Sequence, residues 1–419
     1  MNIKENYRVC GARLDHFEQE CKNISDSTRY IRVESADLEL YSFYREEVDY
    51  YAFRKIDYES HMAFRLNDQP LPIVRIRKND CSLSKELMEE LMRGTGLLVS
   101  ANKSTFFVAN NAIGTMSIRA GAAGTRISRP GICRDLFLAD GLFERNEDLV
   151  LVVRDQEDEE GKRWSKVFAF MTERMKEIPM TLLPKVVELF AAAHEEIGEA
   201  KVDLWECEHD LTRIYLEFPE QKDDFAEIYK LPSTPIPGLI LQMSDTGTCS
   251  FTAYGTARTG STPVIVSEYK RMHTGEVRIE SLLEKVDEHI FRDFRKMPEA
   301  LAELLGNEVP KEQKKEYLFT GLDALELNKL LGKKRVARIK EALEKDVEHL
   351  ELRTEYDICI FLMSLGDSIR GLSKKQKEEL SKLLGKAPYV SYTPEPAAPT
   401  VTFIPFIGHE EELTVKEAI

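Results

Sequence analysis

The amino-terminal part of the chain alternates apolar and charged positions in the manner of β-strands. Residues 30–80 are dense in aromatic and β-branched side chains. The runs MAFRL and LPIVRI flank the turn-forming word NDQP, which predicts a hairpin. A helix is predicted through KELMEELMR, where Leu and Met recur at helical spacing and Gly94 is placed to end it. Three short strands are expected next, in LLVSA, TFFVA and MSIRA.

The central part of the chain is predicted to form a hairpin, then a helix, then further strands. Two strand-like runs in NEDLVLVVRDQEDEEGKRWSKVFAFMT enclose an acidic tip, which has the composition of a solvated hairpin loop. A helix is predicted over residues 182–197, where Pro184 is tolerable in the first turn. The strands expected after it are KVDLWEC, TRIYLEF, LILQM, CSFTAYGTA and PVIVSEY. Sheet is therefore expected to dominate through residue 270.

After Gly275 the apolar positions take the spacing of amphipathic helices, with long runs of Leu, Glu and Lys. Three of these helices are expected to end on LAELLG, LNKLLG and LSKLLG, each of which places Gly just beyond the last helical residue. From Lys386 onward a Pro- and Ala-rich stretch leads to the apolar word FIPFIG. This tail is expected to be extended, and its apolar word to dock on its own body or on a neighbouring copy.

These patterns predict an α+β fold. A sheet-rich and mainly antiparallel amino-terminal and central region is followed by a helical carboxyl-terminal region. A length of 419 residues favours two or three domains. The expected segments are a sheet-rich amino-terminal region (1–80), an α+β core (81–275), a helical region (276–386) and an extended Pro-rich tail (387–419).

Charge and cysteine usage narrow the function classes. A formal net charge of −15 argues against a protein that coats duplex DNA through its overall field. The seven cysteines are scattered singly and odd in number, which fits reduced thiols in the cytoplasm rather than a disulfide framework. Aliphatic runs such as residues 149–153 are too short to span a bilayer, so no membrane association is expected.

One basic cluster departs from the acidic background. Between Leu327 and Lys345 there are seven basic residues and two acidic ones. A clustered basic face on an acidic protein is a candidate contact for the phosphates of a nucleic acid, and the alternative is a solvated helix face paired with neighbouring Glu. The candidate nucleic-acid-binding residues are Lys333, Lys334, Arg335, Arg338 and Lys340.

Other candidate chemistry is sparse. The chain contains no phosphate-binding P-loop word, no dinucleotide-binding glycine fingerprint, no zinc-protease word and no nucleophile elbow, so we predict no catalytic site, no cofactor and no metal. Cys207 and His209 supply two metal-ligand types without a second pair. The glycine-rich words RGTG and RAGAAGTR offer backbone amides to a phosphate, or form tight turns between strands.

Residues 133–271 carry a family likeness. The words KVFAFMTERMKEIP, LLPKVVELF, HDLTRIYLEFPE and PGLILQMSDTGTCSFTAYGTAR occur in an order that resembles the phage/plasmid-like proteins of unknown function. That family carries a Ser-acidic-x-Gly word, which Ser244, Asp245 and Gly247 match. The resemblance implies a protein of a mobile genetic element in a bacterial cytoplasm. We expect Ser244 and Asp245 to shape a turn between strands.

Three functions are consistent with these features. The leading hypothesis is a phage or plasmid accessory protein that binds single-stranded DNA in replication, recombination or evasion of host defence, with the aromatic-rich sheet over residues 41–53 available to stack bases. The second is a self-assembling structural protein that forms homo-oligomers through residues 387–419. The third is an enzyme with an unfamiliar site that uses Asp245, His209 or the glycine turns.

Overall fold

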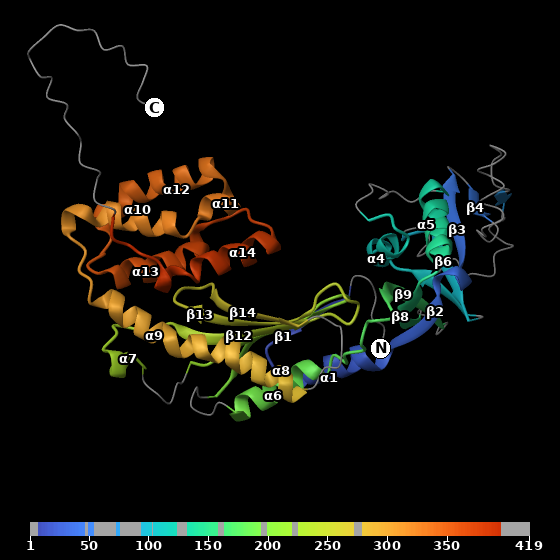
Figure 1. Cartoon of the computed structure of the whole chain (residues 1–419), viewed down its shortest axis with the longest axis horizontal. Coiled ribbons are helices and arrows are strands. Elements are labelled where there is room, and N and C mark those ends of the chain that lie inside the picture. The colour runs from blue at the N-terminus through green and yellow to red at the C-terminus, as the bar shows by residue number, and fades with distance from the viewer. Residues whose placement is uncertain are drawn as a thin grey trace, which may run out of the picture.

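The computed structural model has the α+β architecture expected from the sequence, with antiparallel sheets in the amino-terminal and central regions and helices toward the carboxyl terminus (Figure 1). Two sheets and their covering helices make up the part of the chain that the structure describes. That part comprises residues 7–46, 49–53, 73–75, 94–102, 104–123, 132–157, 163–193, 199–219, 225–271 and 279–394.

The first sheet has six strands, and every neighbouring pair among them is antiparallel. Its side chains alternate between two faces. Leu239 and Leu241 pack with one apolar cluster while Ile240 between them packs with another, as the two-residue period of a strand requires. In spatial order the strands are β1 (Arg8–Gly11), β10 (Lys201–Glu208), β11 (Thr212–Glu217), β12 (Ile236–Met243), β13 (Phe251–Arg258) and β14 (Val264–Arg271).

Helices cover both faces of this sheet (Figure 1). The face that includes Trp205, Ile214 and Leu239 packs against α1 (Leu14–Ser27), α6 (Leu182–Ala193) and α8 (Ile279–Val286). The opposite face carries Tyr254 and Ile265 and receives the carboxyl-terminal helices. Because helices cover both faces of the sheet, β12 and β13 are buried almost throughout.

The second sheet has eight strands, and β7 pairs with β9 in the only parallel register among the described pairs. Its apolar face packs against α4 (Ala112–Arg119) and α5 (Ile132–Arg145), around Leu138, Leu151 and Phe168. The strands in spatial order are β2 (Thr28–Glu34), β8 (Asp148–Glu157), β9 (Arg163–Thr172), β7 (Ser104–Val108), β6 (Leu97–Ala101), β3 (Glu39–Glu46), β4 (Asp49–Phe53) and β5 (Ile73–Arg75).

The chain passes between the two sheets twice. It leaves β1 in the six-stranded sheet through α1 and enters the eight-stranded sheet at β2, and it returns after β9 through α6 to β10. Each sheet therefore takes strands from both sides of residue 80. The segment boundaries given by the sequence stay a prediction.

One expected strand is a helix. The run MSIRA forms the last residues of α4 and its C-cap residue Ala120, and Ala112, Met116 and Ala120 recur every fourth residue and are all buried. That spacing places the three side chains on one helical face against the sheet, so the four-residue period decides the structure over the two-residue alternation of MSIRA. The helix expected over 182–197 is present as α6 to Ala193, and 194–198 lie outside the described residues. The helix predicted through KELMEELMR also lies outside them.

The carboxyl-terminal helices share one apolar core. Residues 387–394, the start of the expected tail, belong to it. Ala387 and Tyr392 are fully buried, and the Tyr392 hydroxyl donates a 2.6 Å hydrogen bond to the Ala387 carbonyl. Residues 395–419, including FIPFIG, lie outside the described residues. The remaining helices are α7 (Phe225–Tyr229), α9 (Arg292–Leu305), α10 (Lys314–Ala324), α11 (Leu327–Leu331), α12 (Lys333–Asp346), α13 (Glu355–Ser364) and α14 (Lys374–Leu384).

Candidate anion-binding surface

The basic cluster found in the sequence forms the first turns of α12. This helix begins directly after Gly332, whose φ of 78° lies in the left-handed region that glycine tolerates. Val336 is buried against the helical core, which turns Lys334 and Arg338, four residues apart, toward solvent. Lys333 is exposed as well. Among the described residues, the side chains of Lys333, Lys334 and Arg338 have no ion-pair or hydrogen-bond partner.

Lys340 lies apart from these exposed groups. Its amine is 2.7 Å from a carboxylate oxygen of Asp323 on α10 and 5.2 Å from the ring centroid of Phe319. A cation held by a carboxylate and an aromatic face contributes to helix packing, and its charge is largely compensated. The structure thus separates Lys340 from the other four candidate residues.

Arg335 joins α12 to a second basic segment. Its guanidinium donates a hydrogen bond to the backbone carbonyl of Arg370, in the connection that leads into α14. Residues 329–340 hold six basic residues and residues 368–377 hold four, and neither stretch contains an acidic residue. The contact therefore places two acid-free basic stretches side by side on a protein with a net charge of −15.

The second stretch was missed in the sequence because it lies within an ordinary amphipathic helix pattern. Ser373 caps α14 in a capping box with Gln376, which fixes where the helix begins. The Lys374 amine lies 3.5 Å from a carboxylate oxygen of Glu208, whereas the side chains of Lys375 and Lys377 have no partner among the described residues. The signal that was available is the absence of acidic residues from 368 to 377.

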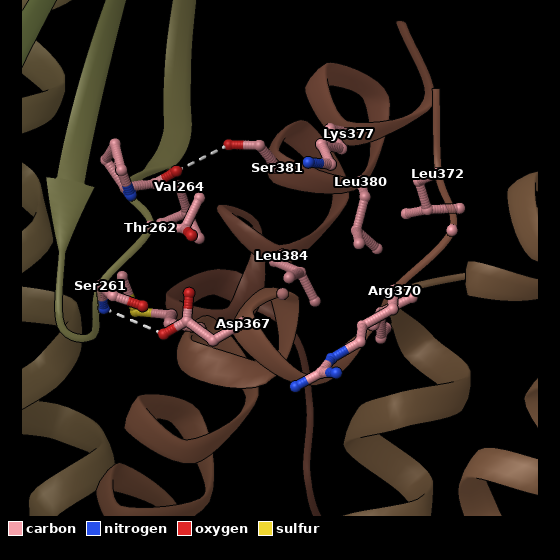
Figure 2. Close-up of a pocket in the computed structure, with 15 residues that line it drawn as sticks. Ser261, Thr262, Val264, Asp367, Arg370, Leu372, Lys377, Leu380, Ser381 and Leu384 are labelled. Atoms are coloured by element: carbon pink, nitrogen blue, oxygen red, sulfur yellow. Dashed lines mark hydrogen bonds between the residues drawn. The ribbon is translucent and has the colours of Figure 1, made fainter. Parts of the chain in front are cut away.

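A cavity of about 370 Å³ lies beside this second stretch, between the β13–β14 turn, the short helix η7 (Leu365–Ser368) and α14 (Figure 2). In Figure 2 the guanidinium of Arg370 extends from its loop to a position below Leu384, and Lys377 lies on α14 in the upper part of the view. The charged side chains in the lining are Arg370, Lys377 and Asp367. Desolvation opposes ionisation of Asp367, but hydrogen bonds from Thr262 and Ser261 outweigh it and lower the pKa of this carboxyl.

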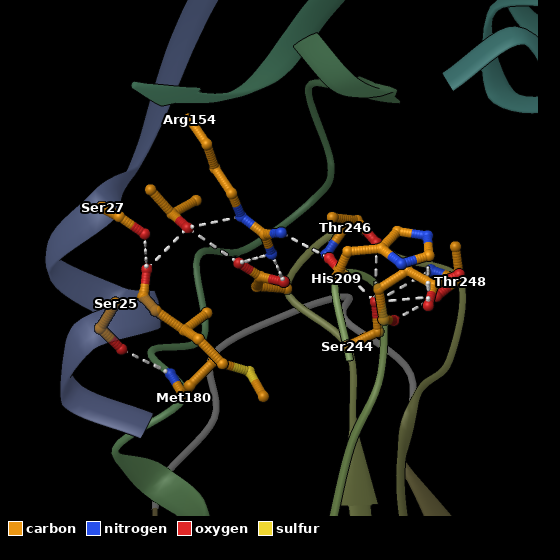
Figure 3. Close-up of polar contacts among 12 residues, drawn as sticks. Ser25, Ser27, Arg154, Met180, His209, Ser244, Thr246 and Thr248 are labelled. Carbon is orange, nitrogen blue, oxygen red and sulfur yellow. Dashed lines mark hydrogen bonds and ion pairs between the residues drawn. The ribbon is translucent and has the colours of Figure 1, made fainter. Parts of the chain in front are cut away.

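The word formed by Ser244, Asp245 and Gly247 is the β12–β13 turn, and it connects the two sheets (Figure 3). Arg154 on β8 donates to both carboxylate oxygens of Asp245, at 2.6 and 2.8 Å, and both side chains are at most 5% exposed. The same guanidinium donates to the carbonyl of His209. Asp245 is thus fully engaged in a buried ion pair.

The rest of this turn satisfies its own backbone. The Ser244 hydroxyl accepts hydrogen bonds from the backbone N–H groups of Thr246 and Thr248, at 3.1 and 3.3 Å. Gly247 has a φ of 72°, and a Cβ there would lie 2.3 Å from the methyl carbon of Met171 on β9. The left-handed φ favours glycine at this position, whereas the flexible end of Met171 could move aside for a Cβ.

The other chemistry considered from the sequence has structural partners. Cys207 is buried in the apolar core, and the imidazole of His209 is 3.6 Å from Asp210. No group of three or more His, Cys, Asp or Glu side chains suited to a metal ion occurs among the described residues. In the word RGTG, the Thr95 carbonyl accepts a 2.6 Å hydrogen bond from buried Arg134. The word RAGAAGTR and the aromatic side chains of residues 41–53 lie partly or wholly outside the described residues.

Comparisons with protein-family models, curated proteins and solved structures found no match to this chain. Within the described part of the chain, no helix has both the length and the apolar composition needed to cross a bilayer.

Proposed function

We propose that this protein binds single-stranded nucleic acid through one continuous basic surface. The contact between Arg335 and the carbonyl of Arg370 carries the proposal, because it brings together two stretches without acidic residues. The resemblance to phage/plasmid-like proteins adds the context of an accessory protein of a mobile genetic element. The basic surface consists of Lys333, Lys334, Arg335, Arg338, Arg370, Lys374, Lys375 and Lys377.

A net charge of −15 does not prevent such binding. Exposed charges more than about 10 Å apart are largely screened at 0.1 M salt, so a nearby phosphate responds mainly to the basic surface itself. Three of the α12 cations, Lys333, Lys334 and Arg338, have no carboxylate partner among the described residues, so a phosphate need displace no ion pair from them. Their attraction is available to a ligand rather than used within the fold.

The shape of the surface favours a flexible strand over a duplex. Its cations occupy one end of α12, one loop and one end of α14 rather than a long stripe along a single helix. From Lys333 to Arg338 the helix rises only about 7.5 Å, which spans one or two phosphates. A single strand can bend between such short contacts, whereas a rigid duplex reaches only part of them.

The test is fluorescence anisotropy with a labelled twenty-nucleotide oligothymidine across a salt series. Contact with about five phosphates predicts a log-log salt slope of about −3.5, at about 0.7 per phosphate on a single strand. Replacing Lys333, Lys334, Arg335 and Arg338 by Glu should abolish binding. The matched control replaces four exposed lysines elsewhere, Lys22, Lys176, Lys201 and Lys296, by Glu and imposes the same change in net charge. Equal loss in both variants, or no salt-dependent binding by the natural protein, overturns the proposal.

Self-assembly through the tail remains a separate prediction, because residues 395–419 lie outside the described residues. The structure sharpens its test. Buried Tyr392 belongs to the helical core, so the truncation should begin at residue 395 rather than at 387. A drop in particle mass by light scattering on deleting residues 395–419 supports assembly, and an unchanged mass counts against it.

A further inference from the structure

The cavity beside the basic surface is closed where the β13–β14 turn meets the helices. The Asp367 carboxylate accepts a 2.9 Å hydrogen bond from the backbone N–H of Ser261. Farther along, the Ser381 hydroxyl donates to the Pro263 carbonyl at 3.0 Å and accepts from the backbone N–H of Ile265 at 2.9 Å. A strand could not pass between the turn and the helices without breaking these bonds. The end of a strand can enter without doing so.

The lining offers charge without internal compensation. Neither Arg370 nor Lys377 has a side-chain partner among the described residues, although both border the cavity. The hydroxyl of Thr262 lies in the same lining, and Leu380 and Leu384 provide apolar surface (Figure 2). The carboxylate of Asp367 is already hydrogen-bonded to the turn. Two cations against one occupied carboxylate leave the lining with a net positive charge.

A neighbouring cavity shows the contrast. It measures about 470 Å³ and shares Thr262, Pro263, Lys377 and Ser381 with the first, whereas Arg370 lines the first cavity alone. Its other cations already have carboxylate partners: Arg8 is 2.9 Å from Glu206, and Lys374 is 3.5 Å from Glu208. A phosphate there would compete with these ion pairs. The first cavity is the one in which cations lack partners.

We propose that the first cavity holds the terminal nucleotide of a bound strand, with its phosphomonoester between Arg370 and Lys377. This inference rests on the proposed nucleic-acid binding and deepens it. A phosphomonoester carries a charge of about −1.5 to −2 at neutral pH, whereas an internal phosphodiester carries about −1, so a cavity lined by two cations favours the end of a strand. The volume of about 370 Å³ lies within the range of small-molecule sites.

The experiment compares strands of one sequence that differ only at their ends: a 5′-phosphate, a 3′-phosphate, hydroxyls at both ends, and a closed circle. Anisotropy competition at fixed salt should show one of the phosphorylated strands binding roughly tenfold more tightly than the hydroxyl strand, the gain of a charge-assisted hydrogen bond. The circle should bind no better than the hydroxyl strand. A free nucleoside monophosphate should compete weakly for the cavity and so reduce the extra affinity of the phosphorylated strand.

Two pairs of variants locate the effect. Thr262→Trp fills the cavity without changing charge and should remove the preference for a terminal phosphate while keeping salt-dependent binding, whereas Thr259→Trp in the same turn lies outside the lining and should keep both. Arg370→Gln should remove the preference, and Lys375→Gln, with the same charge change outside the lining, should keep it. Thermal melting confirms that each variant is folded.

The outcomes separate the two proposals. Equal affinity of all four strands overturns the terminal-nucleotide site and leaves the basic surface standing. A preference that survives both Thr262→Trp and Arg370→Gln places it elsewhere and also overturns the site. If none of the four strands binds, the proposed function itself is overturned.

Discussion

The junction of the two sheets and the basic surface use cationic side chains in opposite ways. At the junction of the sheets, Arg154 is 1% exposed and bound to both oxygens of Asp245. On the basic surface, the side chains of Lys334 and Arg338 are exposed and have no partner among the described residues. A buried and fully partnered charge has no capacity left for a ligand, while an exposed and unpartnered one does.

This difference separates residues that hold the fold from residues available for binding. Ser244, Asp245 and Gly247 match the family word, yet Asp245 is bound to Arg154 of the other sheet and the Ser244 hydroxyl is bonded to the backbone of its own turn. The stretch 368–377 matches no known sequence word, yet it borders both α12 and a cavity. Whether a charged side chain already has partners within the fold is therefore a better guide to the candidate site than the Ser-acidic-x-Gly word.

The strongest test of the contrast is Arg154→Met. Removing one partner of a buried ion pair leaves an uncompensated charge on Asp245, so the free energy of unfolding should fall by about 3–5 kcal/mol. Equilibrium denaturation in urea measures it. The double variant Arg154→Met/Asp245→Leu is the control and should recover part of the loss, because no buried charge is left unpaired. A loss below about 1 kcal/mol for the single variant would show that the pair does not hold the sheets together.

On the basic surface we expect substitutions to change binding and to leave stability almost unchanged. Lys334→Gln and Arg338→Gln should each weaken oligonucleotide binding and reduce the steepness of the salt slope by about 0.7, the contribution of one phosphate. Neither should change the free energy of unfolding by more than about 0.5 kcal/mol, because neither side chain has a partner in the fold. Anisotropy and urea denaturation on the same samples measure both quantities. A stability loss comparable to that of Arg154→Met would contradict the distinction.

Lys340 lies between these extremes and sharpens the boundary. Lys340→Met removes the ion pair with Asp323 and the contact between the amine and the ring of Phe319. The free energy of unfolding should fall by about 0.5–1 kcal/mol. The salt slope should stay that of the natural protein, because the amine is already compensated within the fold. Asp323→Asn is the matched variant, since it removes the same ion pair from the other side. A reduced salt slope for Lys340→Met would show that this residue contacts the bound strand.

The smallest expected effect concerns pH. The pKa of Asp367 is lowered in the folded protein, so its hydrogen bonds to the β13–β14 turn stabilise the fold above the ordinary carboxyl pKa of about 3.9. That contribution is lost as the pH falls through the lowered pKa. Asp367→Asn should remove this part of the acid dependence, seen as a smaller difference in melting temperature between pH 6 and pH 3. An unchanged difference refutes a role for the carboxylate in holding the turn.

Much of the fold was predictable because it depends on neighbours along the chain. The hairpin over residues 148–172 is present as β8 and β9, and its central tip, 158–162, lies outside the described residues. The two-residue alternation and the four-residue helical spacing are local physical consequences of strand and helix geometry. The exception is α4, because the alternation of MSIRA favours a strand, whereas the helical period becomes visible only from Ala112 onward.

What the sequence alone determined is the α+β class, the run of carboxyl-terminal helices and a basic start to α12. The tertiary structure decided which charges are left for a ligand. Arg154 and Asp245 are 91 residues apart, and Arg335 and Arg370 are 35 apart, so no local pattern reveals either contact. Their pairing depends on how the apolar faces of sheets and helices fit together, and that fit fixes which polar groups meet and which remain exposed.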